Sequence, residues 1–235
     1  MNAVDVKEYH GMTFFQLALS PRVQHAFGTR QGWQGILGAF DVSPSQLLTL
    51  EQVHGADVLI VKDDPETLSR PLMYDAVVTD RKGVAVGIWT ADCVPILMVD
   101  AVNGVIAAVH AGWRGLWRGI VRHTVSAMKK TFGTSANNVL VGMGPGIGPC
   151  CYEVGREVVD LFRSAHDDCH LFLLERDGRS YLDLLSASQV QLSEQGIPAG
   201  NIKSVPLCTV CREDLFFSHR RDGETGRQLS CIMLG

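Results

Sequence analysis

The fold is decided by residues 84–115, VAVGIWTADCVPILMVDAVNGVIAAVHAGWRG. They contain runs rich in valine and isoleucine on both sides of Asn103-Gly104, a dipeptide that strongly favours a tight turn. The pattern predicts a hairpin whose second strand, VIAAVH, ends at His110, and Pro95 is expected to interrupt regular pairing in the first strand. A histidine at the end of an apolar strand has two interpretations. Either it is a core side chain with its hydrogen bonds satisfied, or it belongs to a site for a metal or an anion.

The segment that follows this strand is predicted to be a helix over residues 116–132. Its apolar residues recur at helical spacing: Leu116, Ile120, Val121, Val125, Met128 and Phe132. Arg114 would then lie in the turn before the helix, whose free N–H groups attract anions. Because a guanidinium carries a permanent, forked charge, Arg114 is a candidate to bind phosphate; the alternative is an arginine exposed to solvent. Further cationic candidates are Arg30 and, in HRRDGETGR, Arg220, Arg221 and Arg227.

The remaining chain mixes short strand-like runs with separate helices, which are predicted over residues 153–164 and 181–196. The glycine-rich stretch 28–38 is predicted to be a loop near a site. No repeat, low-complexity segment or Pro/Gly/Ser-rich linker divides the chain. We therefore predict one α+β domain over residues 1–235, with a mixed or antiparallel sheet rather than regular βαβ alternation.

Composition argues against two broad classes of protein. Of the 235 residues, 46% are hydrophobic and 20% are charged, and the formal net charge of −4 argues against a nucleic-acid binder with a basic face. No window reaches the roughly 18 uncharged apolar residues that a membrane span needs. The N-terminal MNAVDVKEYHG lacks the apolar run of a signal peptide. With seven cysteines and no export signal, we predict a cytoplasmic protein whose cysteines are thiols or metal ligands.

Three motifs share one arrangement, in which an apolar strand leads into a residue able to bind a metal and then into a turn. They are EQVHGADV with His54, TADCVPIL with Cys93 and AAVHAGWRG with His110. Two imidazoles and one thiolate suit Zn²⁺, and copper also binds such ligands. Three protein ligands would leave a fourth position open for water or substrate, which is the arrangement of catalytic sites. The alternative is two hydrogen-bonded histidines and a cysteine that only packs.

The hairpin register decides whether Cys93 and His110 can share an ion. If residues 100–104 form the loop, His110 lies opposite Val94, beside Cys93. If the turn has only two residues, His110 lies opposite Leu97, roughly 13 Å along the strand from Cys93. Only the first register supports a shared metal.

The remaining cysteines give a weaker signal. Cys208 and Cys211 have C-x-x-C spacing, but a structural zinc site needs a second pair of suitable geometry, and the adjacent Cys150 and Cys151 do not match one. A thioredoxin-type redox motif would need a βαβ unit around it. Packing is therefore the predicted role of these four cysteines.

Five ordered blocks carry a resemblance to a known family: QVHGADV, TADCVPIL, HAGWRGLWRGIV, GMGPGIGPCCYEVG and FFSHRRDGETGR. They resemble the signature blocks of the YfiH/laccase-domain family, formerly described as polyphenol oxidases, from about residue 25 to the C-terminus. The resemblance implies an α+β fold with a β-sandwich-like core flanked by helices, and zinc bound by His54, Cys93 and His110. It also implies a purine nucleoside phosphorylase that acts on adenosine, inosine and methylthioadenosine with phosphate, and that has adenosine deaminase activity.

Other functions stay open at this point. A laccase-like, copper-dependent polyphenol oxidase is the family's older assignment, but the chain's 8 histidines include no H-x-H pair of the kind that multicopper oxidases use. The zinc deaminase signature, H-x-E followed by P-C-x-x-C, is absent too. A metal-free hydrolase would use Cys93 as nucleophile and His110 as base. A non-enzymatic, zinc-stabilised binding module is the remaining alternative.

The sequence thus predicts a zinc-dependent enzyme for purine nucleosides, without nucleic-acid or membrane partners. Arg114 and Arg30 would bind phosphate, which attacks C1′ of the ribose as the base leaves. Asp92, beside Cys93, is predicted to act as an acid or base, or to orient a ligand histidine. The alternative for Asp92 is a strand-end carboxylate that bonds the local backbone.

Overall fold

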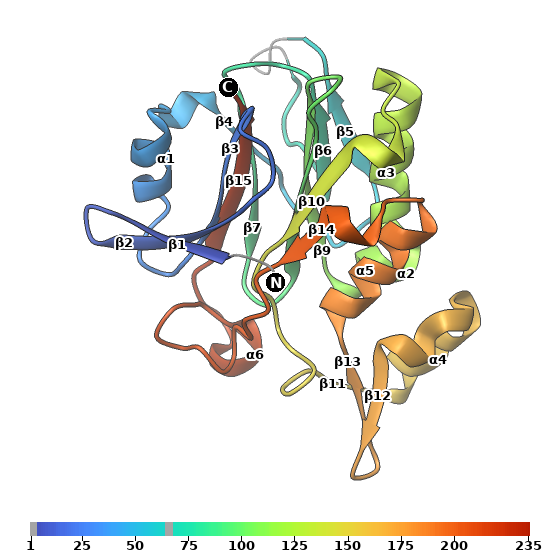
Figure 1. Ribbon diagram of the computed structural model, residues 1–235. Helices are drawn as coiled ribbons and strands as arrows, with labels where there is room; N and C mark the ends of the chain where they lie inside the picture. Colours follow the sequence, from blue (N-terminus) through green and yellow to red (C-terminus); the bar gives the residue numbers. More distant parts are fainter. Residues whose placement is uncertain (1–3, 64–67) are drawn as a thin grey trace.

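The computed structural model describes residues 4–63 and 68–235, in which two six-stranded sheets pack face to face (Figure 1). The first sheet has the strand order β1 (Val4–Tyr9), β2 (Met12–Leu17), β3 (Val23–Gly28), β15 (Gln228–Leu234), β7 (Ala85–Thr90) and β4 (Leu47–Thr49). The second has the order β14 (Ile202–Ser204), β10 (Val139–Met143), β8 (Val94–Asp100), β9 (Val105–Ala111), β6 (Ala76–Thr79) and β5 (Val58–Val61). A small third sheet contains β11 (Glu153–Val154), β13 (Arg179–Leu182) and β12 (Leu173–Arg176).

Both large sheets are mixed. Strand β4 runs parallel to β7, β5 to β6 and β10 to β14, whereas the other pairs are antiparallel. The predicted α+β class with a mixed sheet is therefore confirmed. The predicted domain span of 1–235 includes residues 1–3 and 64–67, which lie outside the described residues. In the described part of the chain, no helix has the length and apolar character to cross a membrane.

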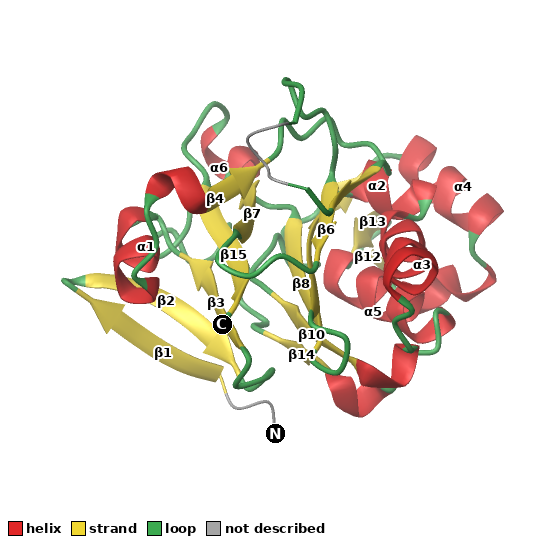
Figure 2. Ribbon diagram, turned by 90° about the horizontal axis from the view of Figure 1, so that it is seen from above, coloured by secondary structure: helices red, strands yellow, loops and turns green. Residues whose placement is uncertain are grey.

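Helices cover the outer faces of both sheets (Figure 2). The first sheet is covered by α1 (Gln34–Phe40). The second is covered by α2 (Trp113–Arg118), α3 (Ile120–Phe132) and α5 (Leu184–Glu194), with α4 (Arg156–Ala165) beside them. The remaining helical segments are α6 (His219–Asp222) and short 3₁₀ turns at Pro44–Gln46, Ala136–Asn138, Asp167–Leu171 and Ala199–Asn201.

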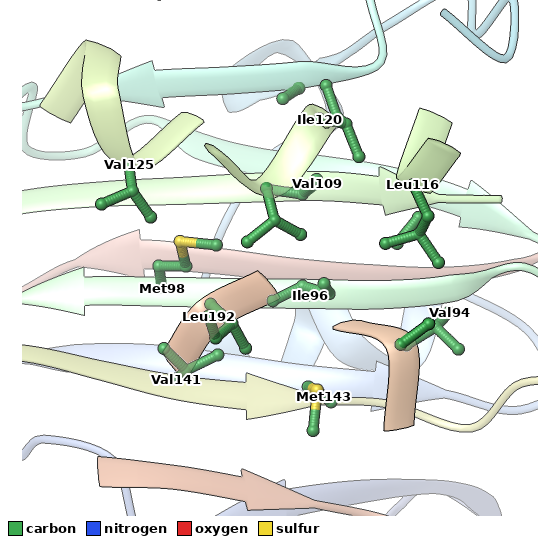
Figure 3. Close-up of a cluster of buried hydrophobic side chains, with 14 of the residues drawn as sticks. Val94, Ile96, Met98, Val109, Leu116, Ile120, Val125, Val141, Met143 and Leu192 are labelled. Atoms are coloured by element: carbon green, nitrogen blue, oxygen red, sulfur yellow. The ribbon is translucent and has the colours of Figure 1, made fainter. Parts of the chain in front are cut away.

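The central strands β8 and β9 are buried along their whole length, because both faces of the second sheet are covered. Successive side chains of a strand point to opposite faces. Leu97 and Val99 of β8 therefore pack between the two sheets, in one cluster with Phe27 and Ile88. The alternate positions face the helices, where the core contains Val94, Ile96, Met98, Val109, Leu116, Ile120, Val125 and Leu192 (Figure 3).

The predicted helix over residues 116–132 is two helices, α2 and α3, divided at Gly119. Gly119 has a φ of 83°, a left-handed conformation that glycine adopts without steric cost. Arg114 consequently lies inside the first turn of α2, not in a turn before it. The other two predicted helices are present, but their first residues belong to β11 and β13 instead. The prediction of a loop over residues 28–38 is wrong in its second half, where α1 begins.

The β8–β9 hairpin has a four-residue loop over residues 101–104, so that His110 lies opposite Pro95. This register differs from both that the sequence left open, and is one residue away from the one expected to place His110 beside Cys93. Pro95 does not interrupt the pairing with β9, contrary to expectation. The amide of His110 points away from β8 and donates to the carbonyl of Asp75 at 2.8 Å. His110 and Pro95 are therefore a pair without backbone hydrogen bonds between them, and the N–H that proline lacks is not needed there.

His25 on β3 should make folding stability depend on pH. Its side chain is buried, its Nε2 accepts the amide of Leu17 at 3.0 Å, and burial lowers its pKa to about 4. Between pH 6.5 and 4 the unfolded chain binds a proton that the folded chain refuses, so the free energy of unfolding falls by about 3 kcal/mol over that range. Urea unfolding at pH 7 and pH 4.5 should show that the free energy of unfolding falls less in His25→Gln than in wild type. The exposed His170, changed to Gln, should behave as wild type, and equal losses in all three proteins would contradict the prediction.

Candidate metal centre and cleft

The structure brings His54, Cys93 and His110 together. His54 lies in the loop after β4, Cys93 in the bend between β7 and β8, and His110 near the end of β9. One ligand atom from each lies within 4.8 Å of the others, and the two imidazole centroids are 4.8 Å apart. These three segments are distant in the sequence, so their meeting is a product of sheet pairing and packing.

Strand register explains how Cys93 reaches His110. His110 lies directly opposite Pro95, and residues that are opposite in an antiparallel pair have their side chains on the same face. Cys93 precedes Pro95 by two positions, and side chains two apart in an extended chain return to the same face. The thiol and the imidazole therefore share one face at one end of the sandwich.

Asp75 contacts the ring of His110 and the backbone of the His54 loop. The sequence analysis did not identify it. It is fully buried just before β6, in a position that continues the pairing of β6 with β9. Its carboxylate bonds Nδ1 of His110 at 2.7 Å and accepts the amides of Val53, His54 and Gly55 at 3.3, 3.0 and 2.6 Å. With Nδ1 occupied, His110 keeps Nε2 for a metal or a substrate. In the sequence YDAVVTD, Asp75 shows only the pattern of a turn residue before a strand.

The three buried groups shift one another's pKa values. Burial raises the pKa of the Cys93 thiol, but the charges and hydrogen bonds of His110 and His54 outweigh it and lower the pKa to about 6. Burial lowers the pKa of His110, but Cys93 and Asp75 raise it to about 9. Burial also opposes ionisation of Asp75, but His110 and the amides of the His54 loop bring its pKa below the usual range. The lowered pKa of Cys93 favours its thiolate, the form that binds metals and acts as a nucleophile.

The donor set fits a borderline-soft ion such as Zn²⁺. It contains two imidazoles and one thiolate, and the carboxylate of Asp75 fixes the tautomer of His110, as outer carboxylates do in zinc sites. Three ligands leave one side open, and the exposed side of His54 faces a cleft of about 1100 Å³.

The walls of this cleft combine aromatic and cationic side chains. Trp33 and Trp89 lie edge to face with ring centroids 5.9 Å apart, and Trp113 and Tyr152 line the cleft as well. Gln52 fixes the backbone of Trp89, donating to its carbonyl at 2.7 Å and accepting its amide at 2.9 Å. Such walls suit a flat heterocycle.

Three of the predicted arginines line the cleft, and two of them lie close to aromatic side chains of its wall. The guanidinium of Arg114 lies 4.4 Å from the ring centroid of Trp113, and that of Arg220 lies 5.0 Å from Tyr152. Arg227 also lines the cleft, whereas Arg221 binds carbonyl groups of the neighbouring loop.

Arg30, predicted to bind substrate or phosphate, is not among the residues that line the cleft. It donates to the carbonyl of Glu213 at 2.6 Å and stacks on Phe217 at 5.0 Å. The physical reason is its position two residues beyond β3, where its backbone bonds Leu215 and its side chain follows that loop.

Asp92 lines the cleft beside Cys93, but among the described residues its carboxylate does not bond a ligand histidine. Oδ1 accepts the hydroxyl of Thr209 at 2.6 Å, and Oδ2 accepts the amide of Arg220 at 2.7 Å. The orienting role expected of Asp92 thus belongs to Asp75. Asp92 instead ties the bend at Cys93 to the two segments that carry Thr209 and Arg220.

Comparison with known proteins agrees with the motifs. The sequence model of a family described as "Multi-copper polyphenol oxidoreductase laccase" matches residues 28–235. The chain belongs to this laccase-domain family. A relative from Bacteroides thetaiotaomicron, named purine nucleoside phosphorylase, is 38% identical over 200 residues, which cover 81% of this chain and 74% of the relative. Another, named adenosine deaminase RL5, comes from an unidentified prokaryote and is 38% identical over 161 residues, or 67% of this chain and 61% of the relative.

A solved structure supports the same fold assignment. The crystal structure of YlmD from Geobacillus stearothermophilus matches this laccase-domain chain with a TM-score of 0.86 and 29% identity, and the match covers 99% of each chain. The β-sandwich-like core flanked by helices that the resemblance implies is thus present.

Gly112 is a position in this laccase-domain site where a side chain would displace the donors. A Cβ there would lie 2.9 Å from Sγ of Cys93 and 3.4 Å from Cδ2 of His54. Its φ of −84° suits alanine, so the penalty is steric only. Gly112→Ala should therefore lower metal affinity and kcat/KM by about 10–100-fold while the protein stays folded. In the control Gly200→Ala, the added Cβ meets no atom within 4 Å, and unchanged activity in Gly112→Ala would contradict the steric argument.

The four remaining paired cysteines, predicted only to pack, lie together in the structure. Cys150, Cys151, Cys208 and Cys211 bring their sulfur atoms within 4.8 Å of one another, at a second cluster separate from the His54 site. The adjacent pair 150–151 is unlike the second pair of a zinc ribbon in sequence. The turn that carries it nevertheless presents both thiols to the C-x-x-C loop.

Proposed function

We propose that this protein is a zinc-dependent purine nucleoside phosphorylase that acts on adenosine, inosine and methylthioadenosine, with adenosine deaminase activity. The observation that carries the proposal is the open donor set of His54, Cys93 and His110 in a cleft lined by aromatic and arginine side chains. The names of the two relatives support both activities at the level of the family.

The residues of the cleft account for the two substrates. The faces of Trp33, Trp89 and Tyr152 offer stacking surfaces to a purine, and Arg114 and Arg220 offer forked donors to phosphate. A phosphate oxygen bonds C1′ of the ribose, and the bond from C1′ to the purine nitrogen breaks. The base leaves with the proton that hydrogen phosphate gives up as it becomes the ester. The products are the free base and ribose 1-phosphate. Zinc, when bound by the three donors, supplies a Lewis-acidic positive charge beside the substrate.

Asp92 is assigned to positioning. Both of its carboxylate oxygens already accept hydrogen bonds, one from Thr209 and one from the amide of Arg220. It therefore holds Arg220 in the cleft wall, where the guanidinium can meet an anionic substrate. This role replaces the acid or base role expected from its place beside Cys93.

The test combines metal analysis with product chromatography. Purified protein should contain zinc and convert adenosine to adenine and ribose 1-phosphate only when phosphate is present. Inosine formed equally with and without phosphate would show a deaminase without phosphorolysis, and so contradict the main activity. Oxidation of phenols with bound copper, or no activity on any nucleoside by a zinc-loaded protein, would overturn the proposal in favour of a laccase or a binding module.

A metal-free cysteine hydrolase is the second candidate, because Cys93 lies beside His110 and their pKa values shift toward a thiolate and an imidazolium. Chelation distinguishes the two. The phosphorylase should lose activity when zinc is removed and regain it when zinc returns. A hydrolase would keep its activity without metal and lose it irreversibly on alkylation of Cys93.

Arg114 should act on the phosphate rather than on the nucleoside. Arg114→Ala should raise KM for phosphate by about 10–100-fold, because a hydrogen bond to a charged group contributes about 1.5–3 kcal/mol, while KM for adenosine changes little. Steady-state kinetics with each substrate varied in turn measures both. Arg30→Ala is the matched control, since Arg30 lies against Phe217 outside the cleft lining. An equal rise in KM for phosphate in both variants would contradict the assignment.

A further inference from the structure

A second cluster of metal-binding side chains lies outside the candidate active site. Cys150 and Cys151 belong to the turn between β10 and β11, and Cys208 and Cys211 belong to the loop after β14. Their four sulfur atoms lie within 4.8 Å of one another. Sγ of Cys211 lies 3.7 Å from Sγ of Cys150 and 3.5 Å from Sγ of Cys151. Nothing in the proposed phosphorylase reaction uses these thiols.

The sulfur–sulfur distances fit the edges of a tetrahedron around one ion. Zinc binds thiolates at about 2.3 Å, so two sulfurs of a tetrahedral Zn–S₄ centre lie about 3.8 Å apart. The observed 3.5 and 3.7 Å are close to that value. A disulfide would bring two sulfurs to about 2.05 Å, far shorter than these separations.

The backbone around the cluster is built to hold the two segments together. Gly146 and Cys208 form a parallel bridge, in which the amide of Thr209 donates to the carbonyl of Gly146 at 3.0 Å. The amide of Gly148 donates to Sγ of Cys208 at 3.2 Å, a hydrogen bond that favours the thiolate. A Cβ on Gly148 would lie 3.2 Å from Sγ of Cys150, so glycine keeps the space beside the sulfurs open.

Arginine side chains surround the same segments. Arg221 donates to the carbonyls of Thr209 and Val210 at 2.9 and 3.2 Å, and Arg176 donates to that of Cys150 at 3.5 Å. One Zn²⁺ with four thiolates has a net charge of −2. The guanidinium of Arg176 lies where it partly offsets such a charge, whereas that of Arg221 is already paired with the carboxylate of Asp222 at 2.6 Å.

We propose that Cys150, Cys151, Cys208 and Cys211 bind one Zn²⁺ as a structural site that fastens the cleft wall. On binding, the ion takes the place of four thiol protons, which pass to solvent. The fastened turn continues into Tyr152, which lines the cleft, and the fastened loop carries Thr209, which holds Asp92 beside Cys93. Such four-ligand sites are closed, so the ion would have no catalytic position. This inference does not depend on the proposed reaction.

Elemental analysis of variants tests the site. The set is wild type, Cys93→Ala, the double variant Cys208→Ser/Cys211→Ser, and Cys169→Ser as a control whose half-buried thiol lies outside both clusters. The double variant should hold one zinc fewer per chain than wild type, and Cys169→Ser should hold as many as wild type. Cys93→Ala should keep the zinc of the four-cysteine site whether or not the His54 site binds metal. The proposed function and the four-cysteine site can therefore be refuted independently of each other. Unchanged zinc in the double variant, or iron in place of zinc, would overturn this one.

Two measurements remain informative if the double variant does not fold. Cobalt substituted into Cys93→Ala should show the visible absorption and thiolate charge-transfer bands of a tetrahedral four-sulfur site. In the wild-type protein, Cys150 and Cys211 are exposed, yet they should resist alkylation until a chelator removes zinc. Rapid alkylation before chelation, or a peptide map that shows disulfides among the four, would overturn the proposal.

Discussion

Replacing Cys93 with alanine is expected to lower the rate of adenosine phosphorolysis by about a thousandfold or more. The change removes the sulfur donor of the His54 site, which also raises the pKa of His110. A bound metal typically contributes several kcal/mol to transition-state stabilisation, and each 1.36 kcal/mol corresponds to about a tenfold change in rate. Measured kcat/KM and zinc content should fall together.

Cys231→Ala is the matched control for this experiment. Cys231 is fully buried in β15 and lies outside the His54 site and the four-cysteine cluster. Its replacement removes core packing without removing a candidate metal donor. It should lower stability slightly and leave kcat/KM unchanged. If Cys93→Ala stays folded with full activity and full zinc content, the assignment of Cys93 to the active site is wrong.

Asp75→Ala should be the most destabilising single change in the site, at about 3–5 kcal/mol. The variant leaves the amides of the His54 loop without an acceptor and the imidazole of His110 without its carboxylate, all in a buried environment. Metal affinity should fall by about 10–100-fold as well, because an outer carboxylate orients the ligand histidine. Urea unfolding and a zinc-binding titration measure the two effects.

Asp100→Ala separates the two effects. Asp100 is equally buried and accepts the amides of Val102 and Asn103 at 3.0 and 3.2 Å, but it lies at the opposite end of β8 from Cys93. Its loss should destabilise the fold while zinc affinity remains at the wild-type value. If Asp75→Ala also keeps wild-type zinc affinity, its carboxylate supports the fold only.

The candidate donors of the site could be proposed from the sequence because their chemistry is local. A histidine or cysteine at the end of an apolar run is visible within a few residues, as in EQVHG, TADC and AAVHAG. The residue that hydrogen-bonds such a donor is not visible in the neighbouring sequence. Asp75 lies 35 positions from His110, and only the pairing of β6 with β9 shows that it faces the imidazole.

The arginines show the same limit. Arg30 and Arg114 have similar local surroundings in the sequence, each near glycine and an aromatic residue. Packing separates them: Arg114 lies on α2 beside the cleft, whereas Arg30 follows the loop at residues 213–217. The sequence left two hairpin loops open, and the observed loop 101–104 differs by one residue from the longer of them. Asn103-Gly104 marks the turn, yet the pairing of His110 with Pro95 depends on β8 as a whole.

The amino-acid sequence was enough to predict the α+β class, most helices and strands and the family, and to propose His54, Cys93 and His110 as candidate donors. Periodicity, turn chemistry and ligand type are properties of neighbouring residues. Three facts became visible in the folded chain alone: Asp75 contacts His110 and the His54 loop, Arg30 is not among the residues that line the cleft, and four scattered cysteines meet. Those facts depend on which segments pack against one another, and packing is settled by the burial of the entire core between and beside the two sheets.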